Sequence, residues 1–213
     1  MIAAWRWRLP LSLSEIFGVV VGLLSMALAI RQNIWNFPTG MAYNIVYFII
    51  FLHARLYGMM GLQVIYFGLQ AHGWYCWKRG IHNVPARVSH VPRKEAKVLL
   101  LLGILATIGL ARYLWHVGGV MVVPDAFTTV FSLLAQYMLN LKRIENWAVG
   151  VCIDLVFIYV YISQGLYLTA GSFVVYLIVC IIGYVQWRRE LQMLSIPTAA
   201  ILEERPLVEM QDR

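Results

Sequence analysis

Long apolar segments separated by short polar gaps run through this chain from residue 11 to residue 187. A helix needs about 20 apolar residues to cross the hydrocarbon core of a bilayer. The candidates are residues 11–30, 38–52, 56–77, 98–115, 120–141, 147–162 and 166–187. Hydrophobic residues make up 61% of the chain and charged residues 13%, against about 45–50% and about 25% in globular domains. We therefore predict an all-α membrane protein with seven transmembrane helices.

The positive charges are distributed unevenly between the gaps. The formal net charge is +7, but the Lys and Arg residues do not form the clustered surface of a nucleic-acid-binding domain. Alternate gaps face opposite sides of the membrane. One side carries Arg31, Lys78, Arg79, Arg87, Arg93, Lys94, Lys97, Lys142, Arg143, Arg188 and Arg189, and the other carries Arg6, Arg8, Arg55 and Arg112. Cytoplasmic loops are rich in positive residues, so we expect the amino terminus outside, the carboxyl terminus in the cytoplasm, and no nucleic-acid partner.

An internal repeat pairs residues 15–79 with residues 125–189, an offset of 110 residues without gaps. Identical pairs such as Asn36/Asn146 and Trp77/Trp187 are poorly explained by apolar composition alone. One helix separates the two sets of three, so both sets enter the membrane from the same side, a design typical of transporters with a site between the repeats. We predict a 3+1+3 arrangement of two parallel three-helix repeats: residues 11–79, a basic cytoplasmic loop and linker helix at 80–119, residues 120–189, and a cytoplasmic tail at 190–213.

A polar stripe on the fifth span predicts which face lines a cavity, because a polar group at hydrocarbon depth normally faces the interior of a bundle. The stripe contains Asp125, Thr128, Ser132, Gln136 and Asn140, spaced three or four residues apart. For Thr128 and Ser132, bonding to neighbouring helices is as good an explanation as ligand contact. For Gln136, ligand contact is the favoured interpretation, because its amide offers both a donor and an acceptor.

The third span carries a second stripe that joins amides to aromatic rings: Gln63, Tyr66, Gln70, Trp74 and Trp77. The equivalent stripe on the seventh span, which includes Tyr176, keeps the rings and loses the amides. Aromatic stripes more often form packed cores than ligand sites. Where rings lie beside amides at membrane depth, however, ligand contact explains the rings as well as core packing does. We predict an asymmetric cavity lined by amides and rings.

Asn44 and Asp154 occupy equivalent positions of the repeat, near the middle of the second and sixth spans. An ionised carboxylate there costs about 2.5–3.5 kcal/mol unless it is paired or hydrated, and no Lys or Arg lies mid-span. Three interpretations of Asp154 stay open. It is protonated, it bonds to a tyrosine such as Tyr159 or Tyr161, or it pairs with a cationic substrate or a proton.

Catalytic and metal-binding motifs are not evident in the sequence. The five histidines lack HExxH spacing, the three cysteines lack CxxC spacing, and no GxSxG, P-loop or dinucleotide fingerprint occurs. We expect no metal, no cofactor and no enzymatic activity. An intramembrane enzyme is the less favoured alternative, because Asp154, His53 and His72 are not spaced as a catalytic pair.

Two stretches of the chain resemble the PnuC-type nicotinamide riboside transporter family. One is PDAFTTVFSLLAQYMLNLKRIENW at 124–147, followed by Asp154 and by QGLYLTA at 164–170. The other comprises Asn36, Pro38 and Gly40, LYG at 56–58, Gln63, Tyr66, and GWYCW at 73–77. The resemblance covers residues 15–189 and implies a bacterial inner-membrane vitamin transporter, a homotrimer in membrane lipid, with a fold distantly akin to the SWEET sugar transporters.

The resemblance also implies a mechanism and a substrate. Members of the family are facilitators, and a cytoplasmic kinase traps the substrate by phosphorylation for NAD biosynthesis. Nicotinamide riboside has a cationic pyridinium ring, which aromatic side chains of the predicted cavity could hold. It also has carboxamide and hydroxyl groups, which the amide side chains could bond. The resemblance implies that Thr128, Asn146 and Trp147 contact the substrate, although Trp147 could equally be an anchor at the membrane interface. The expected substrate-binding residues are Gln63, Tyr66, Trp74, Asn44, Thr128, Ser132, Gln136, Asn146, Trp147, Asp154 and Tyr176. Transport of thiamine, riboflavin or deoxynucleosides is the alternative.

Overall fold

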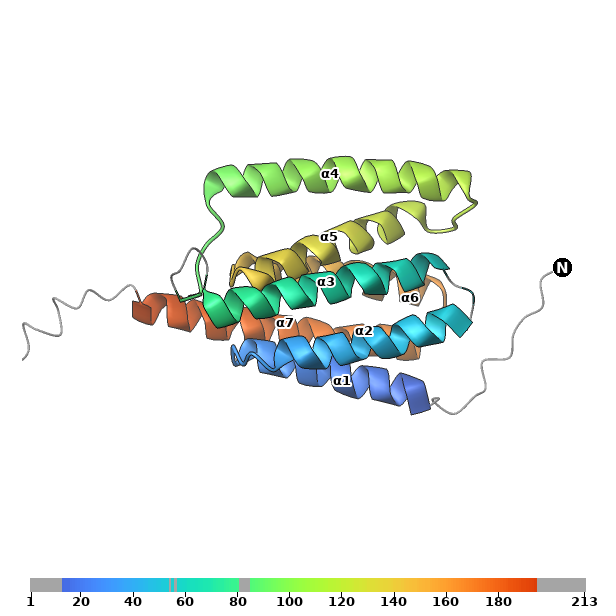
Figure 1. Cartoon of the computed structure of the whole chain (residues 1–213). Coiled ribbons are helices and arrows are strands. Elements are labelled where there is room, and N and C mark those ends of the chain that lie inside the picture. Colours follow the sequence, from blue (N-terminus) through green and yellow to red (C-terminus); the bar gives the residue numbers. More distant parts are fainter. Residues whose placement is uncertain (1–12, 54, 56, 81–84, 195–213) are drawn as a thin grey trace, which may run out of the picture.

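The computed structural model describes all residues except 1–12, 54, 56, 81–84 and 195–213. The described residues form seven α-helices (Figure 1): α1 (Leu13–Ile30), α2 (Asn36–His53), α3 (Tyr57–Arg79), α4 (Arg93–His116), α5 (Val122–Asn140), α6 (Glu145–Ser163) and α7 (Tyr167–Leu194). The prediction of an all-α protein is confirmed. Most of the predicted cytoplasmic tail lies outside the described residues.

Charged residues extend two helices beyond their apolar parts. α4 begins directly after Pro92, at Arg93, and not at residue 98. α7 continues past Trp187 to Leu194. Lys, Arg and Glu are good helix formers, so the helix does not stop where the apolar segment stops. After α3, Gly80 has a φ of 83°, a conformation that ends a helix at little cost when no Cβ is present.

Six of the described helices form a closed ring. Contacts join α1 to α2, α2 to α3, α3 to α5, α5 to α6, α6 to α7, and α7 back to α1. α4 lies outside the ring, where it packs against α5 (Figure 1). The first and second halves of the chain therefore meet at two places, α3/α5 and α7/α1, which we call the seams of the ring.

Four helices in the described part of the chain are long and apolar enough to cross a membrane: α4, α5, α6, and residues Thr169–Met193 of α7. α1 contains a shorter apolar stretch, Val20–Ile30. α3 carries Gln63, Gln70 and His72, and these polar side chains lower its overall hydropathy. On length and composition, the prediction of membrane spans is confirmed for the four helices, and for α1, α2 and α3 it stays a prediction.

Equivalent residues of the two halves make equivalent bonds across the seams. The indole N–H of Trp77 donates to the backbone carbonyl of Asn140 at 3.1 Å. The indole N–H of Trp187 donates to the backbone carbonyl of Ile30, also at 3.1 Å. Each donor and each acceptor lies 110 residues from its counterpart. In both halves, the third helix is thus bonded to the last residue of the other half's first helix.

The buried core surrounds these tryptophans. Trp147 and Trp187 pack edge to face, with ring centroids 5.5 Å apart at 88°. Their equivalents Phe37 and Trp77 pack the same way, 4.9 Å apart at 87°. Burial of large aromatic rings contributes strongly to stability, so these two pairs stabilise the end of the six-helix bundle at which α1 and α5 finish.

Polar contacts made by the residues that follow α1 and α5 reinforce the same end. Lys142 donates to Oε1 of Gln32 at 2.8 Å, and its ammonium lies 4.5 Å from the centre of the Trp77 ring. Gln32 in turn donates to Glu190. Burial lowers the pKa of Lys142, and the charge of Glu190 opposes this shift. The basic loops therefore lie at the end where both seams are bonded together.

Candidate functional site

A cavity of about 450 Å³ lies inside the ring. The described residues that line this central cavity come from α1, α2, α3, α5, α6 and α7, and α4 contributes none. Small-molecule sites typically enclose about 300–1,000 Å³. The central cavity is thus large enough for a compact ligand and is built jointly by both halves of the chain.

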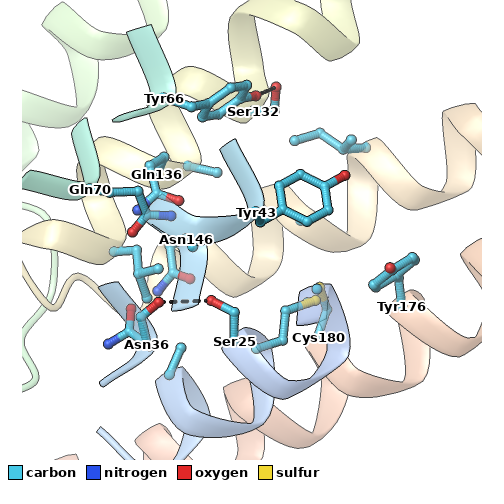
Figure 2. Close-up of a pocket in the computed structure, with 18 of the residues that line it drawn as sticks. Ser25, Asn36, Tyr43, Tyr66, Gln70, Ser132, Gln136, Asn146, Tyr176 and Cys180 are labelled. Carbon is cyan, nitrogen blue, oxygen red and sulfur yellow. Dashed lines mark hydrogen bonds between the residues drawn. The ribbon is translucent and has the colours of Figure 1, made fainter. Parts of the chain in front are cut away.

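Most of the predicted substrate-binding residues line the central cavity: Asn44, Gln63, Tyr66, Ser132, Gln136, Asn146, Trp147, Asp154 and Tyr176. Figure 2 shows Tyr66 and Ser132 joined by a hydrogen bond, which measures 2.6 Å between their hydroxyl oxygens. Ser132 donates its own hydrogen to the carbonyl of Thr129 at 3.0 Å, so Tyr66 is the donor in this pair. The bond connects α3 to α5 and holds one side of the cavity.

Two predicted residues lie away from the central cavity. Trp74 is 41% exposed, because at this level α3 meets its neighbours through Gly73, where a Cβ would come within 2.4 Å of the Asn140 side chain. Thr128 is buried, but its hydroxyl donates to the carbonyls of Pro124 and Asp125, and it lines a second, smaller pocket. Both printed bonds of the Thr128 hydroxyl therefore lie within α5 and do not reach a neighbouring helix.

The expected substrate-binding set leaves out several polar lining residues, namely Ser25, Asn36, Tyr43, Gln70 and Cys180. Gln70 belongs to the third-span stripe and lies beside Gln136 in Figure 2. Asn36 could have been found through the repeat, since it is the equivalent of Asn146. The two side chains make the same local bond, donating to the carbonyl three residues earlier at 2.8 and 2.6 Å. Ser25 donates to the carbonyl of Asn36 at 3.0 Å.

Four lining residues carry a buried polar atom that no described residue satisfies. The atoms are Nδ2 of Asn44, Oε1 of Gln63, Oε1 of Gln70 and Nε1 of Trp147. A buried polar group without a partner costs about 1–3 kcal/mol, so these atoms favour a ligand that offers both donors and acceptors. Trp147 is only 3% exposed, which is incompatible with the alternative of an anchor at the membrane interface.

Asp154 is the one carboxylate among the described lining residues, and no Lys or Arg accompanies it. Its side chain is 7% exposed, and Oδ2 accepts a hydrogen bond from the Cys180 thiol at 3.4 Å. The predicted tyrosine partners are not used: Tyr159 is 67% exposed and Tyr161 lines the second pocket. Within the cavity, a positively charged ligand would find a carboxylate without a competing protein cation.

Aromatic rings complete the lining from several directions. Tyr43 extends from α2, Tyr66 from α3, Trp147 from α6, and Phe173 and Tyr176 from α7. Planar ligands pack on such rings, and a cation over a ring face gains about 0.5–2 kcal/mol. The central cavity therefore combines amides, rings and one carboxylate, which suits a planar cationic ligand with polar substituents.

Comparisons with known proteins agree on one family. A family profile described as "Nicotinamide mononucleotide transporter" matches residues 12–189. The nicotinamide riboside transporter PnuC of Escherichia coli is 27% identical over 205 residues, which cover 83% of this chain and 85% of that protein. The riboflavin/roseoflavin transporter RibM of Streptomyces davaonensis is 24% identical over 184 residues, covering 82% and 84%. The crystal structure of the vitamin B3 transporter PnuC shares the fold, with a TM-score of 0.65 at 21% identity, covering 84% of this chain and 82% of that one.

Proposed function

This chain belongs to the PnuC-type nicotinamide mononucleotide transporter family, and from this premise we propose that it carries nicotinamide riboside across the bacterial inner membrane by facilitated diffusion. Its relatives are transporters and not enzymes. The observation that carries the proposal is the central cavity, where unsatisfied amide and indole atoms lie with one uncompensated carboxylate in a polar, ring-lined space.

Each part of the riboside has a matching group in the cavity. Its pyridinium is a planar cation, for which Asp154 supplies the charge and Trp147 or Tyr176 a ring face. Its carboxamide and ribose hydroxyls offer donors and acceptors to the free atoms of Asn44, Gln63 and Gln70. Ser132, Gln136 and Asn146 complete the proposed substrate-binding set. Thr128 and Trp74 do not line this cavity and would act on the substrate only indirectly.

The charge of the cavity also separates the riboside from two of the alternative substrates, riboflavin and deoxynucleosides. Riboflavin has an uncharged three-ring system and would leave the carboxylate of Asp154 without a counter-charge. Thiamine is cationic and deoxynucleosides are not, so the charge argument ranks thiamine as the nearest competitor. A competition assay with thiamine, riboflavin and a deoxynucleoside separates these substrates.

The equivalent contacts of the two halves support the 3+1+3 arrangement with a SWEET-like fold. The indole bonds at both seams and the matching positions of Asn44 and Asp154 in the cavity are the relations expected for two parallel repeats. In this proposal α4 is the linker helix. Rocking one repeat against the other would open the cavity alternately to each side of the membrane. The basic loops would face the cytoplasm, with the amino terminus outside.

Uptake by a facilitator continues beyond equal concentrations only if the substrate is removed on the inner side. Our proposal includes a cytoplasmic kinase that phosphorylates the riboside. The phosphate adds negative charge, and the cavity has no described Lys or Arg to bind it, so the product would not return through the transporter.

α4 exposes apolar side chains such as Leu101 and Leu105, each 57% exposed. Lipid would cover these side chains, or a neighbouring subunit would cover them if the protein is a homotrimer. Native mass spectrometry would test whether it is a homotrimer.

Uptake of radiolabelled nicotinamide riboside into liposomes that contain only this protein tests the proposed function. We expect uptake to be faster than in empty vesicles, to stop at equal concentrations inside and outside, and to continue when a riboside kinase and ATP are enclosed. Uptake no faster than in empty vesicles would reject transport of the riboside, and faster uptake of thiamine alone would reassign the substrate.

A further inference from the structure

A second pocket, of about 290 Å³, lies between the start of α5 and the end of α6. We call it the outer pocket, because these helix ends are remote from the basic loops around Lys142. Residues 120–128 and 157–164 supply its lining. None of the residues that line the outer pocket lines the central cavity.

The outer pocket offers the same two kinds of group as the central cavity, a carboxylate and aromatic rings. Asp125 supplies the carboxylate, and it forms no salt bridge with any residue that the structure describes. Phe157 and Tyr161 supply the rings. The hydroxyl of Thr128 is already bonded to backbone carbonyls. No Lys or Arg is among the described lining residues, so the pocket suits a cation with a planar ring.

A run of neighbouring aromatic rings extends from the outer pocket to the central cavity. Phe173 lines the central cavity, and its ring lies 4.5 Å from that of Phe157 and 5.3 Å from that of Tyr161, with the latter pair nearly parallel at 15°. The ring centroid of Phe173 also lies 5.9 Å from that of Tyr176, which lines the central cavity too. The first-half equivalent of Phe173 is Gln63, so this path of rings belongs to the second half.

We propose that the outer pocket is a second binding site for the transported aromatic cation, which it holds between Asp125 and Tyr161 before the ligand passes along the Phe157–Phe173 rings to the central cavity. The inference rests on the proposed function. A carboxylate at the mouth of a pocket raises the local concentration of cations and their rate of arrival. A site on the path speeds arrival and departure equally, so the equilibrium affinity of the central cavity does not depend on it.

Stopped-flow measurement of association and dissociation rates, with purified full-length protein and nicotinamide riboside, tests this inference. Asp125→Asn is expected to slow association about threefold to tenfold at low salt, with an unchanged equilibrium Kd, and to lose this effect in 1 M salt, where the Debye length is about 3 Å. Asp125→Glu keeps the charge and is expected to behave as the unchanged protein. An uncharged nucleoside that binds the protein is expected to associate at the same rate with the unchanged protein and with Asp125→Asn.

A second pair of variants tests the rings separately from the charge. Tyr161→Leu is expected to slow association, whereas Tyr159→Leu, on the same helix but 67% exposed and outside the outer pocket, is not. If Asp125→Asn and Tyr161→Leu both associate at the original rate, the outer pocket is not on the path and the inference is wrong. If the unchanged protein neither binds nor transports the riboside, the proposed function fails first, and the inference falls with it.

Discussion

Replacing Asp154 with Asn is the sharpest test of the charge argument. The change removes the one carboxylate of the described cavity lining and leaves an amide of the same size, the group that Asn44 provides at the equivalent position. The Cys180 thiol can still donate to the new amide oxygen. At about 5 Å and an effective dielectric constant of about 20, a carboxylate attracts a cation by about 3 kcal/mol. We expect a loss of about 2–3 kcal/mol, or about 30–150-fold in Kd.

Isothermal titration of detergent-purified protein measures this loss, and the uncharged ligand provides the control. Nicotinamide riboside is compared with its reduced form, in which the ring carries no positive charge. Affinity for the cation should fall, affinity for the reduced form should not, and the melting temperature should not fall. Equal losses for both ligands would refute the electrostatic role of Asp154 and favour a hydrogen bond. Normal affinity for the riboside together with lost transport would assign Asp154 to gating.

Three further changes test the site and the fold. Gln63→Leu removes a lining amide with an unsatisfied oxygen, so titration should show riboside binding weakened by about 1–2 kcal/mol without a lower melting temperature; unchanged affinity would remove this residue from the site. Trp187→Phe leaves a buried carbonyl of α1 without its donor and should lower stability by about 1–3 kcal/mol in a thermal melt; an unchanged melt would show that the bond contributes nothing. Gly183→Ala places a Cβ 2.6 Å from the Trp147 ring and should destabilise by about 1–3 kcal/mol, whereas Gly171→Ala on the same helix, with nothing within 4 Å, should not.

The polar stripes predicted much of the central cavity for a simple reason. At hydrocarbon depth an amide or a carboxylate faces the interior of the bundle, so Gln63, Gln136, Asn44 and Asp154 could be placed from spacing and depth alone. The repeat added a second constraint, because equivalent positions such as Asn44 and Asp154 face the same space.

The remaining cavity residues could not be predicted in this way. Ser25 is an isolated polar residue in an apolar helix and forms no stripe. Cys180 belongs to the seventh-span stripe as the equivalent of Gln70, but a cysteine in an apolar segment predicts packing and not ligand contact. Trp74 continues the α3 stripe in sequence, but periodicity does not show where a helix stops facing the cavity. That limit depends on the approach of Asn140 to Gly73, a contact between residues far apart in the chain.

The position of α4 makes the two halves mechanically unequal. Because α4 packs on α5, the proposed rocking motion would move α4 together with the second half, through lipid if lipid covers it. The first half has only three helices to move. In a viscous bilayer the smaller of two bodies moves further when they turn against each other, so under the proposed mechanism α1, α2 and α3 should rotate through the larger angle.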